Sequence, residues 1–508
     1  MKPTTPRGFD SRTTGISSVS RQAPFLRRRA GRPIALASLV AASLAAGVLV
    51  LLTQTENMAL LLWNLAILSL LAFNFTAIYT PRTYLFSSGF WTALFFAFYF
   101  VLKSTEYFDE PENPWVVAAL MYCSIFLVFF NASYLLSSHG QRPQPSPERF
   151  TVKSGRRLAI TCTIIFIASK VLNYLAVAAV VPGGYNQVEL AQSTQNEGMA
   201  YIFRAFSIGQ FALLMLMAFY FIHRRHGAYL LACIAVYLLD AAGSASRGGL
   251  IVLILSVFYL YDRYVKRISP LWLVAIAPVL IFIVSFFGYA RSIEIGSVDV
   301  YLDAFRYFLG DSEMIWRLFM GRLDLLPTVA NALLAHASGE LPQLWGSSYV
   351  GILTHFIPRN LWPSKPPLTA AYMTAAVLPD NFAAGVLVYP TMVLEGFLNF
   401  GYVGIALSGA FAGYLSHRYD RWMSSRRLGP TFFYLAFFTF PMGLIAEGIH
   451  SNFVAFSLYS VALLWILLEM LYLTGALKRV SHRNGTRVHG TKAATQSALP
   501  PGSPERVS

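Results

Sequence analysis

Residues 270–290 read PLWLVAIAPVLIFIVSFFGYA, an apolar run without a charged side chain. A helix of about 20 residues, rising 1.5 Å per residue, crosses the hydrocarbon core of a bilayer, which is about 30 Å thick. Runs of the same kind recur from Ile34 to Leu473. Backbone groups in lipid are satisfied only in helices or closed barrels, and these runs lack the alternating pattern of barrel strands. The sequence therefore predicts an all-α, polytopic transmembrane helical bundle.

We expect about twelve membrane spans. They lie near residues 34–53, 57–79, 84–102, 115–137, 158–181, 199–222, 227–243, 249–265, 270–290, 397–416, 430–446 and 452–473. The first span follows a basic tail and is interpreted as a retained signal-anchor rather than a cleaved signal peptide, because a second span follows almost at once.

The composition agrees with a chain that is largely surrounded by lipid. Of the 508 residues, 56% are hydrophobic and only 12% are charged, whereas soluble domains carry about 25% charged residues. Cys123, Cys162 and Cys233 fall inside apolar spans without ligand spacing, so neither a disulfide nor a zinc site is predicted. The net charge of +15 comes from basic residues scattered over the connections. This distribution favours orientation in the membrane over nucleic-acid binding.

The connections between spans alternate in charge, which predicts the orientation of the chain. Every second connection is basic and is expected in the cytoplasm. These basic residues are Arg82, Arg142, Arg149, Lys153, Arg156, Arg157, Arg224, Arg225, Arg263, Lys266, Arg267, Arg418, Arg421, Arg426, Arg427, Lys478 and Arg479. The opposite connections are acidic or neutral, and their acids include Glu106, Asp109, Glu110, Glu112, Glu189 and Glu197. Both termini are therefore expected in the cytoplasm.

One connection, between spans nine and ten, is much longer than the others and is expected on the periplasmic side. Loops of this length are usually functional or disordered, and this one carries helical patches at Tyr301–Phe319 and Leu325–His336. The expected organisation is a disordered basic tail at 1–33, spans one to nine at 34–290, the periplasmic loop at 291–390, spans ten to twelve at 391–475 and a second disordered basic tail at 476–508.

Several cations lie in spans or on the outer side, where orientation does not explain them. They are Lys103, Lys170, Arg204, Arg247, Arg291, Arg306, Arg317, Arg322, Arg359 and Lys365. A cation retained in the membrane tends to have a partner and is a functional candidate. For Lys103 and Arg306 the alternative is that the side chain simply extends to the membrane interface.

Two segments combine such cations with an unusual backbone. Ser244-Ala-Ser-Arg-Gly-Gly249 is a tight outer turn in which Gly248 and Gly249 leave amide groups free at a helix start, so that Arg247 marks a candidate anion site. Phe356-Ile-Pro-Arg-Asn-Leu-Trp-Pro-Ser-Lys-Pro-Pro367 is stiffened by four prolines and carries Arg359 and Lys365. This segment suits a diphosphate, and Trp362 could stack on a sugar ring. For the turn at 244–249 the alternative is a plain helix-hairpin turn without a ligand. For the segment at 356–367 the alternative is a re-entrant loop with a purely structural role.

Candidate general bases follow this segment. In Pro390-Thr-Met-Val-Leu-Glu-Gly-Phe-Leu-Asn-Phe-Gly401, Glu395 lies near the outer mouth of span ten, with Asn399 one helical turn later on the same face. Glu447 and His450 lie in the short outer turn between spans eleven and twelve. Either acid could accept a proton from a sugar hydroxyl, and a histidine titrates near neutral pH. A purely structural hydrogen bond is the alternative for each residue.

At these residues the chain resembles the bacterial O-antigen and exopolysaccharide repeat-unit polymerases, the Wzy-type family. Three features carry the resemblance: the Ser-Arg-Gly-Gly turn at 246–249, the Ile-Pro-Arg-Asn-Leu-Trp-Pro-Ser-Lys-Pro segment at 357–366 and the Glu-Gly-Phe-Leu-Asn-Phe-Gly segment at 395–401. With the layout of about twelve spans and one large outer loop, the resemblance covers most of the chain outside its tails.

The resemblance implies a glycosyltransferase that needs no metal or cofactor and uses undecaprenyl-diphosphate-linked oligosaccharides at the periplasmic face. It would transfer the growing glycan to a hydroxyl of a newly flipped repeat unit and release undecaprenyl diphosphate. Arg247, Arg291, Arg359 and Lys365 would bind the diphosphate. Besides its lipid-linked substrates and membrane lipid, the candidate partners are a chain-length regulator and a flippase.

Two other functions stay open at this point. A periplasmic ligase would use similar architecture and cations on a different acceptor. A glycolipid flippase or transporter would be expected to show paired repeats or broken helices in matching halves, whereas the distinctive loop of this chain lies in only one half. A lipid-linked-sugar mannosyltransferase is disfavoured, because the first outer loop, at 54–57, lacks an acidic pair.

Overall fold

The computed structural model describes a helical bundle. It describes residues 57–78, 86–108, 113–138, 150–180, 205–243, 247–290, 298–321, 323–354, 362, 369–383, 387–423, 425, 427–437, 440–449 and 459–479. The first expected span, the tail at 1–33 and residues 480–508 of the second tail lie outside the described residues, as do Arg204, Arg291, Arg322, Arg359, Lys365 and His450. For Arg247 the backbone is described but the side chain is not.

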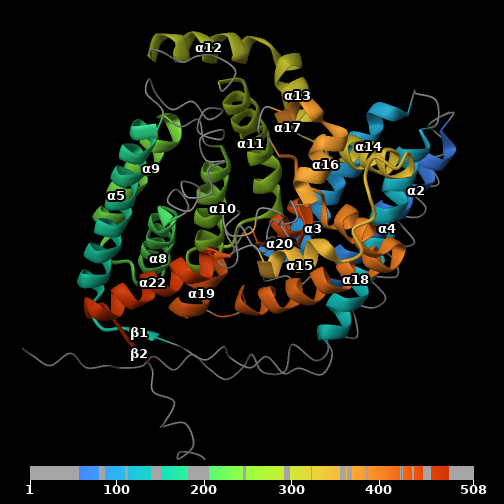
Figure 1. Cartoon of the computed structure of the whole chain (residues 1–508). Helices are drawn as coiled ribbons and strands as arrows, with labels where there is room; N and C mark the ends of the chain where they lie inside the picture. The colour runs from blue at the N-terminus through green and yellow to red at the C-terminus, as the bar shows by residue number, and fades with distance from the viewer. Residues whose placement is uncertain are drawn as a thin grey trace, which may run out of the picture.

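The described parts of the expected spans from the second onward are largely helical, which confirms the helical fold class (Figure 1). These helices are α2 (Met58–Ile78), α3 (Ser88–Phe96), which continues as a π-helical turn at Ala97–Leu102, α4 (Pro114–Ser138), α5 (Gly155–Val180), α8 (Ile208–His223), α9 (Gly227–Gly243), α10 (Arg247–Tyr264), α11 (Pro270–Ala290), α18 (Met392–Met423), α19 (Leu428–Ala436), α20 (Phe440–Glu447) and α22 (Tyr459–Leu473). The eleventh expected span is divided between α19 and α20.

Not every helix is long enough to cross a bilayer by itself. Among the described residues, four helical stretches qualify by length and composition, at Pro114–Ser137, Gly155–Ala179, Ser312–Ala337 and Met392–Met423, and shorter apolar helices accompany them. The stretch Ser312–Ala337 lies within the expected outer loop, where the chain forms two separate helices. A multi-pass helical bundle is therefore evident, while the count of twelve spans stays a prediction.

The long connection after α11 is largely helical where it is described. It contains α12 (Val298–Gly310), α13 (Ser312–Met320), α14 (Leu325–Ala337), α15 (Ser347–Thr354), α16 (Thr369–Val377) and α17 (Pro379–Ala383). The first three of these cover the two stretches for which helices are expected. Asp311 caps α13, because its side chain accepts a hydrogen bond from the backbone N–H of Met314 at 2.8 Å.

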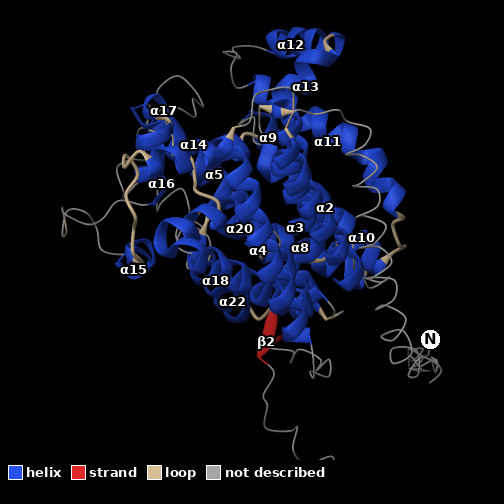
Figure 2. Ribbon diagram, turned by 90° about the vertical axis from the view of Figure 1, so that its right-hand side faces the viewer, coloured by secondary structure: helices blue, strands red, loops and turns tan. Residues whose placement is uncertain are grey.

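A small β-sheet departs from the all-α expectation. Strand β1 (Phe150–Val152) pairs antiparallel with β2 (Leu477–Arg479), so that Phe150 lies opposite Arg479 and Val152 opposite Leu477. Both views place this sheet at the end of the molecule opposite to α12 (Figures 1 and 2). A strand of three residues carries no periodicity that a sequence pattern could reveal, and here a tertiary contact creates it.

Helices α4 and α18 pack with their backbones close together. A Cβ atom built on Gly409 would lie 2.4 Å from the carbonyl oxygen of Phe126, and one on Gly413 would lie 2.2 Å from that of Phe130. Small residues four positions apart let two backbones approach, which is how helices associate when lipid removes the hydrophobic driving force. The spacing of these glycines therefore fixes α18 against α4, and α18 carries the candidate site.

Candidate functional site

Helix α18 consists of two helical segments, 392–399 and 402–423, with a break between them. Phe400 has φ −141° and ψ 25°, and Gly401 has φ 60° and ψ −142°, a combination that only glycine adopts readily. A Cβ atom built on Gly404 would lie 1.9 Å from the carbonyl oxygen of Gly396. The second segment thus folds back beside the first at contact distance. The sequence predicts a span at 397–416, and most of it lies in the second segment; only its first residues belong to the other segment, because the helix is broken at Phe400 and Gly401.

The ends of the short first segment are satisfied by neighbouring residues. The Thr391 hydroxyl accepts a backbone N–H of the first turn at 3.2 Å. At the other end the N–H of Leu344 donates to the carbonyl of Leu398 at 2.7 Å, and the Gln343 amide donates to the carbonyl of Phe397 at 3.1 Å. Carbonyls at a helix end have no partner inside the helix. The stretch that precedes α15 therefore stabilises the break in α18.

Asn399 joins this stretch to Glu395. Its side-chain oxygen accepts hydrogen bonds from the backbone N–H of Gly346 and the hydroxyl of Ser348, both at 3.0 Å. Its amide nitrogen donates to the backbone carbonyl of Glu395 at 2.7 Å and to Ser348 at 2.7 Å. The side chain of Asn399 is fully buried. The two residues lie one turn apart on one face, as the sequence predicts.

Glu395 lies against the turn that follows α20. Its carboxylate is fully buried and accepts a hydrogen bond from the backbone N–H of Ile449. Gly448 has φ 83°, and a Cβ atom there would lie 2.6 Å from the Glu395 carboxylate and 2.9 Å from the carbonyl of Pro390. The fold thus brings Glu395 next to the turn after Glu447, although the two are distant in sequence. Glu395 therefore lies deeper in the protein than the outer mouth of span ten, where the sequence places it, because this turn covers its carboxylate.

A tyrosine completes the polar surroundings of Glu395. The ring of Tyr349 stacks on Phe400, with 6.1 Å between the ring centroids. Burial raises the pKa of Tyr349 and the carboxylate of Glu395 raises it further, while a hydrogen bond to Ser408 lowers it. The net shift is upward, so the phenol stays protonated near neutral pH and keeps a hydrogen to donate. Ser348 and Tyr349 were not predicted from the sequence, because a single hydroxyl within the long outer connection carries no signal of its own.

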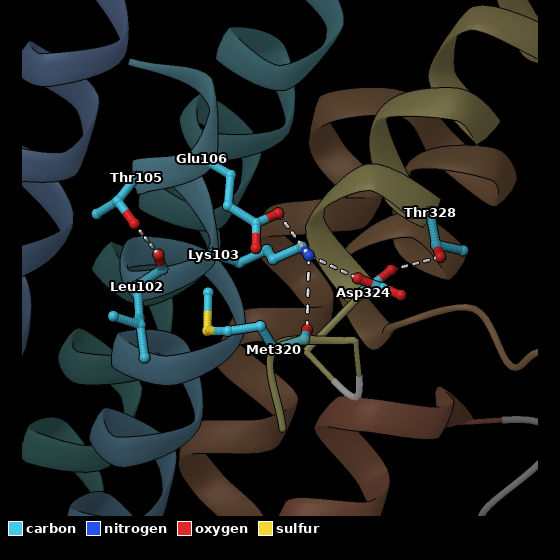
Figure 3. Close-up of polar contacts among 7 residues, drawn as sticks. All are labelled: Leu102, Lys103, Thr105, Glu106, Met320, Asp324 and Thr328. Atoms are coloured by element: carbon cyan, nitrogen blue, oxygen red, sulfur yellow. Dashed lines mark hydrogen bonds and ion pairs between the residues drawn. The ribbon is translucent and has the colours of Figure 1, made fainter. Parts of the chain in front are cut away.

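A second charged cluster lies where the outer connection meets the bundle (Figure 3). The Lys103 amine lies 2.6 Å from the carboxylate of Glu106, 2.8 Å from that of Asp324 and 3.5 Å from the carbonyl of Met320. Burial lowers the pKa of Lys103, but the bonds to Asp324 and Glu106 outweigh burial and raise it overall. Lys103 is therefore a buried, paired cation that ties the junction of α13 and α14 to the bundle.

The remaining cations differ from Lys103 in their surroundings. The side chain of Arg306 is 77% exposed and lies 3.3 Å from the equally exposed Asp303, as expected of a surface residue. Within the bundle, Lys170 of α5 lies 2.5 Å from the carboxylate of Asp240 in α9 and over the ring of Tyr237. This pair shows that an intramembrane cation has found a partner, in line with the cost of leaving it alone.

The diphosphate-binding residues expected from the sequence are not brought together by the described part of the structure. The side chains of Arg247, Arg291, Arg359 and Lys365 lie outside it, as does His450. Trp362 is described as a half-buried residue, and Glu447 is half-buried at the end of α20. The contacts that the structure adds are those of Glu395 and Asn399.

The fold and this buried polar site define a multi-pass helical membrane protein. The family model described as "O-antigen polysaccharide polymerase Wzy" matches residues 34–474, and the chain therefore belongs to this family. The match confirms the resemblance drawn from the three sequence segments, all of which lie inside it. No curated protein and no solved structure matches the chain.

Proposed function

We propose that the protein polymerises undecaprenyl-diphosphate-linked oligosaccharide repeat units at the periplasmic face of the bacterial inner membrane. The family match over residues 34–474 carries this proposal, because it spans every candidate site residue. In the proposed reaction a hydroxyl of the incoming repeat unit attacks the anomeric carbon of the growing glycan. The bond from that carbon to the diphosphate breaks, a protein base takes the hydroxyl proton, and undecaprenyl diphosphate leaves.

The proposed orientation has about twelve spans and both termini in the cytoplasm. Its support from the fold is the pairing of β1 with β2. The alternation of basic connections assigns both of these segments to the cytoplasm, one before α5 and the other after α22. Because paired strands must lie on the same side of the membrane, the sheet agrees with an even number of spans between them. Helix α12, assigned to the periplasm, lies at the opposite end (Figure 2).

The leaving diphosphate needs cations in the proposed reaction, and no metal ion is invoked. We assign this role to Arg247, Arg291, Arg359 and Lys365, and we assign sugar stacking to Trp362. Arginine offers a forked donor pattern that matches phosphate oxygens, and cations placed where charge develops stabilise a transition state. All four are expected in the membrane or on its outer side, so the orientation of the chain does not account for their positive charge.

Glu395 is the first choice for the base, with Glu447 and His450 as the second. The supporting observation is that Glu395 contacts the turn that follows Glu447, so these two candidates belong to one region of the fold. Because its carboxylate also accepts the N–H of Ile449, a structural role for Glu395 has to be separated from proton acceptance. The substrate hydroxyl can reach Glu395 only if the covering turn moves.

A cell-free assay with purified protein and defined lipid-linked repeat units tests the cationic part of the proposal. Arg359→Ala should abolish long-chain product, and Arg359→Lys should restore it only in part because the forked geometry is lost. Arg306→Ala is the matched control, since Arg306 is an exposed outer arginine, and it should leave the product unchanged. Full activity of Arg359→Ala at normal protein abundance would remove this residue from the site.

The assignment of the base is tested with two variants of Glu395. Glu395→Gln keeps an oxygen that can accept the N–H of Ile449 but cannot take up a proton, so it should bind both lipid-linked sugars and lose turnover. Glu395→Ala removes the hydrogen bond as well and should also lower thermal stability. Normal turnover in Glu395→Gln would move the search to Glu447 and His450.

A further inference from the structure

Trp345 has an unusual backbone conformation for a large side chain. Its φ is 49°, in the left-handed region that L residues with a Cβ atom disfavour, and its side chain is 79% exposed. The residues on both sides are held in place, because Leu344 donates its N–H to Leu398 and Gly346 donates its N–H to Asn399. The strained conformation is therefore imposed by the bonds that stabilise the break in α18. It turns the indole away from the protein.

Two further aromatic side chains are exposed at the break in α18, and one of them lies beside the segment that carries Trp345. Phe400 is 44% exposed and Tyr402 is 55% exposed, and both lie at the break in α18. A Cβ atom on Gly346, the residue after Trp345, would lie 2.9 Å from the ring of Phe400, so the two segments touch. The rings of Phe400 and Tyr402 are held by Tyr349 and Tyr122, at centroid distances of 6.1 Å and 5.3 Å. We call Trp345, Phe400 and Tyr402 the aromatic platform.

We propose that the aromatic platform binds a pyranose ring of the lipid-linked glycan, an inference that rests on the proposed function. The flat face of an aromatic ring packs against the C–H groups of a sugar and leaves the hydroxyls free for hydrogen bonds. Asn399 positions Gly346, and Glu395 lies one helical turn before Asn399. A sugar on the platform is thus bound at the tip of the same short helix that carries the candidate base.

The backbone of Trp345 favours a sugar over a lipid surface. Tryptophans that anchor a protein at the membrane interface need no special backbone and occur on regular helices. Strained conformations persist where the surrounding structure imposes them, and they cluster at ligand sites. A glycine at position 345 would relieve the strain, yet the chain has its largest side chain there. Trp345 makes no hydrogen bond or ring contact with the rest of the described chain, which leaves its face available.

The experiment measures binding of two lipids to the full-length protein in nanodiscs. One probe is undecaprenyl diphosphate that carries the host's own repeat-unit oligosaccharide, and the other is undecaprenyl diphosphate without sugar. Trp345→Ala should weaken binding of the glycosylated lipid about tenfold and leave the sugar-free lipid unchanged. Trp345→Tyr should retain most of the affinity. Trp465→Ala is the control, since Trp465 is 64% exposed on α22, and it should affect neither lipid.

Trp345→Gly provides a second variant that does not depend on the folding of the alanine variant. Its melting temperature should equal or exceed that of the wild type because the strain is relieved, while the affinity for the glycosylated lipid falls as in Trp345→Ala. An equal loss for both lipids, or no loss for either, would show an interface anchor and overturn the platform. If the wild type binds neither lipid, the proposed function fails as well. If it polymerises and Trp345→Ala keeps full glycan affinity, only the platform fails.

Discussion

The substitution Gly404→Ala is a direct test of the fold-back that forms the candidate site. The added methyl group would lie 1.9 Å from the carbonyl oxygen of Gly396, whereas ordinary contact begins at 3.4 Å. This oxygen belongs to the backbone, so no side chain can rotate away. The two segments of α18 must therefore separate by about 1.5 Å to admit a single methyl group.

Because Gly409 and Gly413 hold the second segment against α4, the first segment is expected to move, and it then shifts relative to residues 344–346, which are hydrogen-bonded to its end. The N–H of Leu344 lies 2.7 Å from the carbonyl of Leu398, and that of Gly346 lies 3.0 Å from the side chain of Asn399. Neither bond survives an increase of about 1.5 Å. Each buried group that loses its partner costs about 1–3 kcal/mol, so the expected loss of stability is about 2–6 kcal/mol.

Two measurements check this expectation. The melting temperature of Gly404→Ala should fall, and turnover in the cell-free polymerisation assay should drop about 100-fold, since a misplacement of about 1 Å has such effects on catalysis. Gly310→Ala is the matched control, because a Cβ atom there meets nothing within 4 Å. If Gly404→Ala behaves like Gly310→Ala in both assays, the two segments of α18 are not in backbone contact at Gly396 and Gly404.

Three further predictions concern the rest of the fold. Asp324→Asn weakens the bond to Lys103 by about 1.5 kcal/mol, so amide hydrogen exchange in α13 and α14 should become about tenfold faster. The control Asp303→Asn, whose partner is an exposed arginine, should change the exchange rate little. Equal effects of the two substitutions would contradict the burial of the Lys103–Asp324 pair. Gly413→Ala places a methyl group 2.2 Å from a backbone oxygen of α4 and should destabilise the protein by about 1–3 kcal/mol, and an unchanged melting temperature would argue against that backbone contact. A periplasmic reporter fused after Arg427 should be inactive, and activity there would refute the proposed orientation.

The sequence by itself determined the helical class and most helix positions. Runs of about 20 apolar residues have few alternatives in lipid, because unpaired backbone groups are too costly there. For this reason α9 and α11 begin and end at the residues expected for their spans, 227–243 and 270–290. The contact of Asn399 with Glu395 was also predictable, since residues four positions apart in a helix lie on one face.

Only the tertiary structure decided how these helices are interrupted and paired. The reversal at Gly401 depends on hydrogen bonds from Leu344 and Gly346, which lie far away in the sequence, and hydropathy does not register a change in one φ angle. Likewise, an isolated lysine at the end of a span is compatible with an interfacial position or a buried ion pair, and the approach of Asp324 selects the ion pair for Lys103. Local hydrophobicity and backbone hydrogen bonding decide whether a segment is a helix or a loop. Long-range contacts between specific polar groups decide where a helix breaks and which charged side chain is buried.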